Sequence, residues 1–458
     1  MRHASSSSSA ARAETRAPSS TTPSAPIAVG LLATALLLAL SACGGDGASS
    51  ASAVMVQDSA GVQIITNPGA GAWSADEAWN IEEELRIGVA EGDPELQFGM
   101  LVGVDADAEG RIVTLDQQGA RVRVFGADGE LLHAFGRAGG GPGELSQALS
   151  PATGVFYEAD GSIAIPDMGN LRLARFSPTG QSLDSPRLAI EATGIPILFS
   201  RTADRDLVVQ YRQMAIPGAG AMGGDDPSGD RIVRLAPASA EGDALVEVPA
   251  GETFSMGAGG MPQFRIFAPE PVWAILSDGR VVTGTNNEYS LTLHPTGGAA
   301  AGPDARAGSG RTIVRRTVDR IPVTDRQQTQ MRNLFRQSFE DSGQPIPQEV
   351  VEQLVGSMEF ESHWPVLAAV LPGPDGTLWV QRVEAGARLE ELTIEALQAG
   401  EFGSRRWDVF DSEGTYMGAV NMPEGVQPLR FVGDRLYGIH SDDLRIQRAV
   451  RLRVNRGG

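Results

Sequence analysis

Short runs of alternating apolar and polar residues recur along the chain from residue 101 onward. Gly110–Leu115 (GRIVTL), Arg121–Phe125 (RVRVF) and Leu131–Phe135 (LLHAF) follow this pattern, and Gly-containing turns separate them. Successive side chains of a β-strand point to opposite faces of its sheet. A period of two joined by short turns therefore predicts an antiparallel meander.

The meander repeats at a fixed interval. Gly110 and Gly161 are 51 residues apart, and Phe125 and Phe176 have the same separation. Looser copies follow, beginning at Asp206, Ser277 and Pro374. A four-stranded sheet cannot bury both of its faces alone, so repeated sheets must stack on one another. The repeat predicts an all-β fold, a β-propeller whose blades surround an axial channel.

The segment 324–361 interrupts the strand pattern. Thr324 and Gln327 have the spacing of a capping box, and apolar residues then follow at helical intervals on two stretches. These residues are Met331, Leu334, Phe335, Phe339, Val350, Val351, Leu354, Val355 and Met358. We expect an inserted αα-hairpin whose apolar stripe either is core on the propeller's flank or overhangs a rim and shapes a binding site. A further short helix is expected around 388–398, and Gly-rich excursions at 215–230 and 297–310.

The N-terminal region reads as an export signal. Ile27–Leu40 is an uncharged apolar run that is too short to span a bilayer but typical of a signal peptide. It ends at Leu40-Ser41-Ala42-Cys43, which resembles a bacterial lipobox. That resemblance implies a signal peptide over 1–42, acylation of Cys43, and a flexible tether over 43–53. We therefore expect a membrane-anchored lipoprotein outside the cytoplasm, at the outer membrane, in the periplasm or on the cell surface.

The amino-acid composition excludes several kinds of catalytic chemistry and of partner. The 458 residues carry a formal net charge of −20, and all 37 basic residues are arginine, because the sequence contains no lysine. Schiff-base catalysis and a phosphate-loop lysine are thereby excluded. An acidic chain repels phosphate backbones, so we expect no nucleic-acid partner. The lone cysteine, Cys43, cannot form an intramolecular disulfide or a Cys-ligated cluster, and no cofactor is expected.

The segment Gly136–Leu145 (GRAGGGPGEL) resembles the GxGxGPGEF element of the bacterial six-bladed β-propeller family, which is related to NHL-type propellers. The motif residues are Gly136, Gly139, Gly141, Pro142, Gly143 and Glu144. The resemblance implies six blades over 54–458, with seven as the lesser alternative. It also implies that N-terminal strands close the ring against the last blade near Arg435–Val454. It implies no shared catalytic residues. We expect the element to be a crossover between blades rather than a phosphate loop.

Three residues are weak candidates for a metal site. Asp105 and Asp107 have the spacing of the first ligands of a calcium loop, although ordinary Asp-rich turns explain the same residues. His363 precedes an expected inner strand and could face the channel. Because no close pair of histidines occurs, any metal site would have to be assembled from several blades.

An arginine-rich stretch is either a solvated strand and helix start or a docking patch for an acidic ligand. Its members are Arg311, Arg315, Arg316, Arg320 and Arg326. Taken together, the sequence predicts a lipid-anchored propeller that serves as a binding or scaffold module for a protein, peptide or glycan partner. The alternative is a metal-assisted lyase or lactonase acting in the channel. A lesser alternative is a sensor whose helical insertion engages a membrane partner.

Overall fold

The structure is a computed structural model. It describes residues 54–147, 149, 154–216, 220–222, 229–256, 262–296, 310–341, 346–385 and 403–457. The chain divides into two compact units, Met1–Ser50 and Ala51–Gly458. The expected signal peptide, Cys43, the tether, the helix expected at 388–398 and most of both Gly-rich excursions lie outside the described residues.

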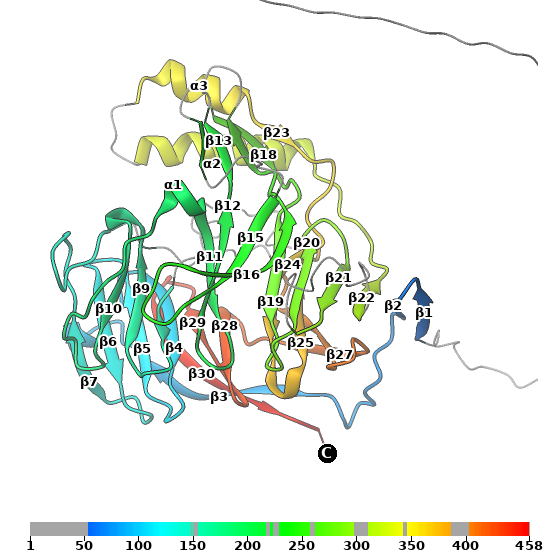
Figure 1. Ribbon diagram of the computed structural model, residues 1–458, viewed down its shortest axis with the longest axis horizontal. Helices are drawn as coiled ribbons and strands as arrows, with labels where there is room; N and C mark the ends of the chain where they lie inside the picture. The colour runs from blue at the N-terminus through cyan, green and yellow to red at the C-terminus, as the bar shows by residue number, and fades with distance from the viewer. Residues whose placement is uncertain are drawn as a thin grey trace, which may run out of the picture. The chain divides into compact units, whose positions relative to one another are not determined.

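Six antiparallel meander sheets hold most of the strands, and we number them in chain order (Figure 1). Sheet 1 contains β4 (Leu101–Ala106), β5 (Ile112–Asp116), β6 (Arg121–Phe125) and β7 (Leu131–Phe135). Sheet 2 contains β8 (Phe156–Tyr157), β9 (Ile163–Asp167) and β10 (Arg172–Phe176). Sheet 3 contains β11 (Ile195–Arg201), β12 (Leu207–Arg212), β15 (Gly229–Leu235) and β16 (Gly242–Pro249).

The later three sheets follow the same pattern. Sheet 4 contains β19 (Pro271–Ile275), β20 (Val281–Thr285), β21 (Ser290–His294) and β22 (Arg311–Arg316). Sheet 5 contains β24 (Leu367–Pro372), β25 (Leu378–Arg382), β26 (Arg406–Phe410) and β27 (Tyr416–Asn421). Sheet 6 contains β28 (Val426–Val432), β29 (Arg435–Ser441), β30 (Gln447–Asn455) and, on its outer edge, β3 (Asn80–Ile87). The predicted repeat is confirmed, because β9 and β10 follow β5 and β6 at the expected interval.

Apolar clusters join each sheet to the next. Each cluster contains residues of two neighbouring sheets. In order, from the junction of sheets 1 and 2 to the junction of sheets 6 and 1, representative pairs are Val122 with Ile163, Leu173 with Val209, Ile232 with Trp273, Leu291 with Val380, Trp407 with Leu452, and Tyr437 with Phe125. Each sheet thus buries both faces against its two neighbours, and the cycle of clusters closes on itself. The fold is a β-propeller. The cycle supports the expected six blades, a count that stays a prediction.

The N-terminal strands bind to two different sheets. β3 pairs with β30 in antiparallel register from Asn80↔Asn455 to Ile87↔Ala449, so the closure expected against the last blade is confirmed. By contrast, β1 (Met55–Ser59) and β2 (Val62–Asn67) extend sheet 4, where β2 lies parallel to β22.

The connection between β2 and β3 also contacts sheet 5. The backbone N–H groups of Ala72 and Trp73 donate to the carbonyls of Tyr416 and Met417, at 3.1 and 2.8 Å. We call residues 55–87 the N-terminal strap, because this one segment hydrogen-bonds to sheets 4, 5 and 6.

The helical insertion forms as predicted, with α2 at Asp325–Asp341 and α3 at Gln348–Gly356. Its capping box is reciprocal: the Thr324 N–H donates to Gln327 Oε1 at 3.0 Å, and the Gln327 N–H donates to Thr324 Oγ1 at 3.3 Å. The apolar stripe packs as core around Met331, Val355 and Trp364. The apolar stripe is therefore core, as the first of the two interpretations expected.

The remaining elements are short. They are α1 (Ile190–Thr193), β13 (Met214–Ile216), β14 (Gly220–Met222), β17 (Phe254–Met256), β18 (Pro262–Ile266), β23 (Glu359–Phe360) and the 3-10 turns Pro94–Leu96, Met168–Asn170 and Pro374–Gly376. β18 and β23 pair in parallel, and Figure 1 shows both beside α2 and α3.

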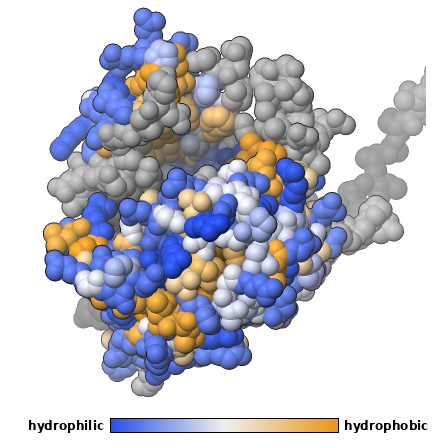
Figure 2. All heavy atoms as spheres, turned by 90° about the vertical axis from the view of Figure 1, so that its left-hand side faces the viewer, coloured by the Kyte–Doolittle hydropathy of each residue, from blue (hydrophilic) through white to orange (hydrophobic). Residues whose placement is uncertain are grey.

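The outer surface is mostly polar. Figure 2 shows the side that carries β7 and β10, where hydrophilic residues surround small, separate apolar groups. Leu132 on β7 is one of the few large apolar side chains that are exposed. Among the described residues, no helix combines the length and the apolar character needed to cross a bilayer.

Candidate functional site

A cavity of about 650 Å³ lies where the first strands of the sheets face one another. Five strands contribute to its lining: β4, β11, β19, β24 and β28, and Gly154, just before β8, adds to it. Since five sheets present their first strand to this space and sheet 2 contributes a residue just before its first strand, the cavity is the axial channel of the propeller. Gly103 on β4 allows the close approach of the next sheet, because a Cβ there would lie 2.8 Å from the backbone nitrogen of Val155.

One rim of the channel is built from equivalent turns. Neighbouring strands of a meander run in opposite directions, so the turn after each first strand lies at the same rim in every sheet. Each of these turns carries an aspartate: Asp107, Asp160, Asp204, Asp278, Asp375 and Asp434. The Asp-Gly turns that stand out in the sequence therefore mark the rim. By the same alternation, the insertion 324–361 joins β22 to β24 at the opposite rim, and none of its described residues lines the cavity.

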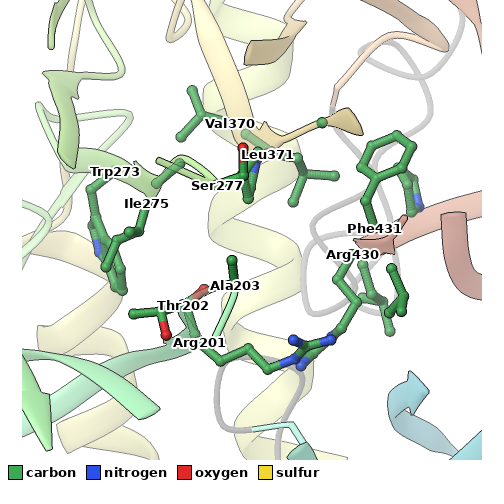
Figure 3. A pocket seen from close by; sticks show the side chains of 18 of the residues that line it. Arg201, Thr202, Ala203, Trp273, Ile275, Ser277, Val370, Leu371, Arg430 and Phe431 are labelled. Carbon is green, nitrogen blue, oxygen red and sulfur yellow. The ribbon is translucent and has the colours of Figure 1, made fainter. Parts of the chain in front are cut away.

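The walls of the channel are mainly apolar. Figure 3 shows Trp273 and Ile275 on one side, Val370 and Leu371 on another, and Phe431 on a third. Trp273 is held in place because its Nε1–H donates to Gln210 Oε1 at 2.7 Å. Apolar walls with a few fixed polar groups are typical of sites that bind small molecules.

The polar groups gather around one buried carboxylate, Asp105. Its Oδ1 accepts hydrogen bonds from the Ala106 N–H at 2.8 Å and from Arg201 Nη2 at 3.1 Å. Its Oδ2 accepts from the Tyr157 N–H at 2.8 Å and lies 3.4 Å from Arg430 Nη1. We call Asp105, Arg201, Arg205 and Arg430 the channel arginine cluster; Figure 3 shows Arg201 reaching across the cavity toward Arg430.

Burial and mutual repulsion shift the pKa values in this cluster. Burial would raise the pKa of Asp105, but Arg201 and Arg430 hold it below its usual range, so the carboxylate is ionised. Burial, together with the neighbouring Arg201 and Arg205, lowers the pKa of Arg430 to about 10, against the opposing effect of Asp105. The Arg430 guanidinium also lies 4.4 Å from the centre of the Phe156 ring, a cation–π contact that fixes its plane.

The sequence candidates for a metal site do not come together. Asp105 is buried against Arg201 and Arg430, which line the channel, whereas Asp107 pairs with Arg111 at 2.5 Å. His363 does not line the cavity: it forms a bridge with Pro322, and its Nδ1 lies 2.9 Å from Ser362 Oγ, so the expectation that it faces the channel was wrong. In the part of the chain that the structure describes, no three His, Cys, Asp or Glu side chains are placed to hold one ion.

The glycine-rich element is a crossover between sheets 1 and 2, as expected. Gly139 and Gly143 have φ values of +155° and +77°, which favour glycine. The Gly141 N–H donates to Glu144 Oε2 at 2.8 Å, and Arg172 Nη2 donates to the Glu144 carbonyl at 2.7 Å. These hydrogen bonds hold in place the loop that connects β7 to β8. Gly136, Pro142 and the other motif residues belong to this loop, which lies outside the channel.

The arginine-rich stretch is divided by burial. Arg316 is buried and pairs with Asp408, beneath Tyr289 and Tyr416. Arg311, Arg315, Arg320 and Arg326 are exposed. None of the five lines the cavity, so the stretch and the channel are separate features.

Sequence reasoning missed Arg201 and Arg430. Each stands near the end of an otherwise apolar inner strand, in PILFSR and VQPLRFV. A charged residue in such a strand was the signal that could have identified them.

No protein-family model matches the chain, and no curated protein matches it. Solved structures that resemble it include a Bacteroides fragilis protein described as exported, with 12% identity, 86% of this chain and 100% of that chain covered, and a TM-score of 0.44. Virginiamycin B lyase from Staphylococcus aureus has 12% identity, coverage of 82% and 99%, and a TM-score of 0.37. The aldose sugar dehydrogenase of Streptomyces coelicolor has 12% identity, coverage of 83% and 99%, and a TM-score of 0.39. Nothing about function is taken from likenesses this distant.

Proposed function

We propose that the protein is an extracytoplasmic six-bladed β-propeller, anchored to a membrane by lipid on Cys43, that acts as a binding module. Its partner is a protein, peptide or glycan, and the partner engages the channel and the rim of Asp-bearing turns. The lipobox-like sequence supports the location and the anchor. The channel supports the binding role.

The observation that carries the binding role is the state of Asp105. Its two oxygens are occupied by backbone N–H groups and arginines, so it is not free to act as a base or a metal ligand. The groups that line the channel include apolar side chains and guanidinium donors, which recognise ligands. The metal-assisted alternative would need ligands that Asp105 and Asp107 do not offer while their arginine partners stay in place.

Photo-crosslinking in the native cell tests the binding role. A crosslinking amino acid at Ser277, on the channel rim, is expected to capture a partner, whereas the same group at Leu132, on the outer edge of sheet 1, is expected to capture none. Ala203→Trp, which places an indole at the channel mouth, should abolish capture, and Leu132→Trp should not. Equal capture from both positions, or capture that survives Ala203→Trp, would contradict the proposal.

Metal analysis of the purified chain separates the binding module from the alternative enzyme. We expect less than stoichiometric zinc and calcium and an unchanged melting temperature in chelator. One bound equivalent that is lost in Asp105→Asn would favour the enzyme.

The anchor is tested by metabolic labelling with a palmitate analogue. We expect label on the wild-type chain and none on Cys43→Ala, which should also leave the membrane fraction. A mature protein that begins upstream of Cys43 would show that the lipobox interpretation is wrong.

A further inference from the structure

The channel arginine cluster carries more positive charge than its carboxylate can neutralise. Three guanidinium groups, on Arg201, Arg205 and Arg430, surround the single ionised carboxylate of Asp105. Arg205 does not contact that carboxylate by a hydrogen bond; it donates to the Ala106 carbonyl at 3.1 Å. The cluster therefore has a net charge of about +2 in a site with apolar walls, where unbalanced charge is costly.

The nearby carboxylates do not remove this excess. Asp107 and Glu109 lie near Arg205, but both also pair with Arg111. The acidic residues that line the cavity are Asp375, which pairs with Arg456, and Asp434, which lies 3.5 Å from Arg435. Each of these carboxylates thus faces an arginine outside the cluster.

Several donors of the cluster lack an acceptor. Nε of Arg201 and Nε of Arg430 are buried atoms without a hydrogen-bond partner among the described residues, and Nη1 of Arg430 has only its ion-pair contact with Asp105 at 3.4 Å. The side chain of Arg201 is only 10% exposed and that of Arg430 only 17% exposed. Buried donors almost always have partners, and an unmet one costs about 1–3 kcal/mol. Because these nitrogen atoms are enclosed, a ligand in the channel would contact the parts of the two guanidinium groups that line the cavity, and its negative charge would offset the positive charge that Asp105 leaves unbalanced.

We propose that Arg201 and Arg430 bind an oxyanion group, a carboxylate or a phosphate, of a small molecule or chain end that enters the channel. Guanidinium groups suit this task because their donors match the geometry of both oxyanions. Trp273 and Phe431 then contact the apolar portion of the same ligand. The inference rests on the proposed function, since it names the chemistry that the channel recognises.

Calorimetric titration of the full chain in detergent tests this inference. The probes are inorganic phosphate, benzoate and, as the neutral counterpart of benzoate, benzyl alcohol. At least one of the two anions should bind, and benzyl alcohol should bind at least tenfold more weakly than benzoate if benzoate is the anion bound. Binding of phosphate alone would identify the phosphate form of the group, and binding of benzoate alone the carboxylate form.

Variants assign the binding to the cluster. Arg201→Gln and Arg430→Gln should weaken anion binding at least tenfold, whereas Arg336→Gln, which changes an exposed arginine on α2, should leave it unchanged. Arg430→Lys keeps the charge but loses the planar donor set, so an intermediate affinity is expected. Circular dichroism checks that each variant is folded, and Arg430→Lys keeps the test informative if Arg430→Gln does not fold.

The inference would be overturned if no anion binds the wild type, or if both glutamine variants bind as tightly as the wild type. Equal binding of benzyl alcohol and benzoate, with quenching of the Trp273 fluorescence in every variant, would also overturn the inference. The channel would then still be a ligand site. Arg-dependent anion binding without rim crosslinking would instead uphold this inference and contradict the wider proposal of a macromolecular partner.

Discussion

Buried Asp–Arg pairs recur near strand ends in several sheets. In three pairs the buried carboxylate faces an arginine on the neighbouring strand, and in the fourth an arginine on the neighbouring sheet: Asp116 with Arg123, Asp167 with Arg172, Asp230 with Arg212, and Asp408 with Arg316. Arginine keeps its charge when buried and offers several donors at once, which suits a chain without lysine. Removing one partner of such a pair lowers the free energy of unfolding, because the remaining charge stays buried without a partner.

Asp408 provides the sharpest case. Its carboxylate accepts hydrogen bonds from Arg316 and, at 2.7 Å, from the Tyr289 hydroxyl. Asp408→Ala leaves the Arg316 charge buried and unpaired, so the free energy of unfolding should fall by about 3–5 kcal/mol. Chemical denaturation measures this loss. Glu352→Ala, which breaks the exposed pair with Arg336, should cost about 0–1 kcal/mol, and equal losses in the two variants would contradict the argument.

His294 should make stability depend on pH. Burial, and then the nearby Arg311, lower its pKa to about 4, whereas the unfolded value is near 6.5. The folded state therefore favours the neutral imidazole. As the pH falls from about 6.5 to 4, protonation of His294 in the unfolded state lowers the free energy of unfolding. Above that window His294 adds nothing to the pH dependence. Nuclear magnetic resonance titration of the imidazole should give a midpoint near pH 4. In His294→Gln the fall in stability across this window should be smaller; a midpoint at or above 6.5 would refute the prediction.

At the level of elements, the capping box decides how well α2 begins. Thr324→Ala removes the hydroxyl that accepts the Gln327 N–H, so we expect a loss of about 1 kcal/mol in the free energy of unfolding. Thr329→Ala is the matched control, because Thr329 lies within α2 and its hydroxyl only donates to the Asp325 carbonyl. Denaturation curves that coincide for the two variants would show that the cap contributes nothing.

Elements that depend on local sequence could be predicted, and those that depend on distant pairing could not. β5, β6, α2 and α3 follow from alternation, turns, helical spacing and a cap, all within a few residues. N-terminal strands were expected against the last blade, but the parallel pairing of β2 with β22 depends on a partner far along the chain. The site could not be predicted from the sequence for the same reason. Arg201 and Arg430 belong to different repeats, and only the closed ring brings both to Asp105.

For the whole molecule, closure of the ring rests on β3. A chain that begins at residue 89 lacks this strand, so sheet 6 loses its outer edge and sheets 5 and 6 lose the contacts of Trp79 and Ile81 with their shared cluster. We expect this truncation to aggregate or to unfold without a cooperative transition.

A chain that begins at residue 70 is the matched control, since it lacks β1 and β2 but keeps β3. It should remain a folded monomer with a lower melting temperature. Size-exclusion chromatography and circular dichroism distinguish the two outcomes. A folded, cooperative chain from residue 89 would show that closure does not depend on β3.

The N-terminal strap has a mechanical consequence. Neighbouring sheets are otherwise joined covalently by one crossover, but the strap adds a second continuous path across the seams between sheets 4, 5 and 6. Under a pulling force, those two seams share the load between two stretches of backbone. Rupture of the ring should therefore begin at a seam that the strap does not cross, between sheets 6 and 1, 1 and 2, 2 and 3, or 3 and 4.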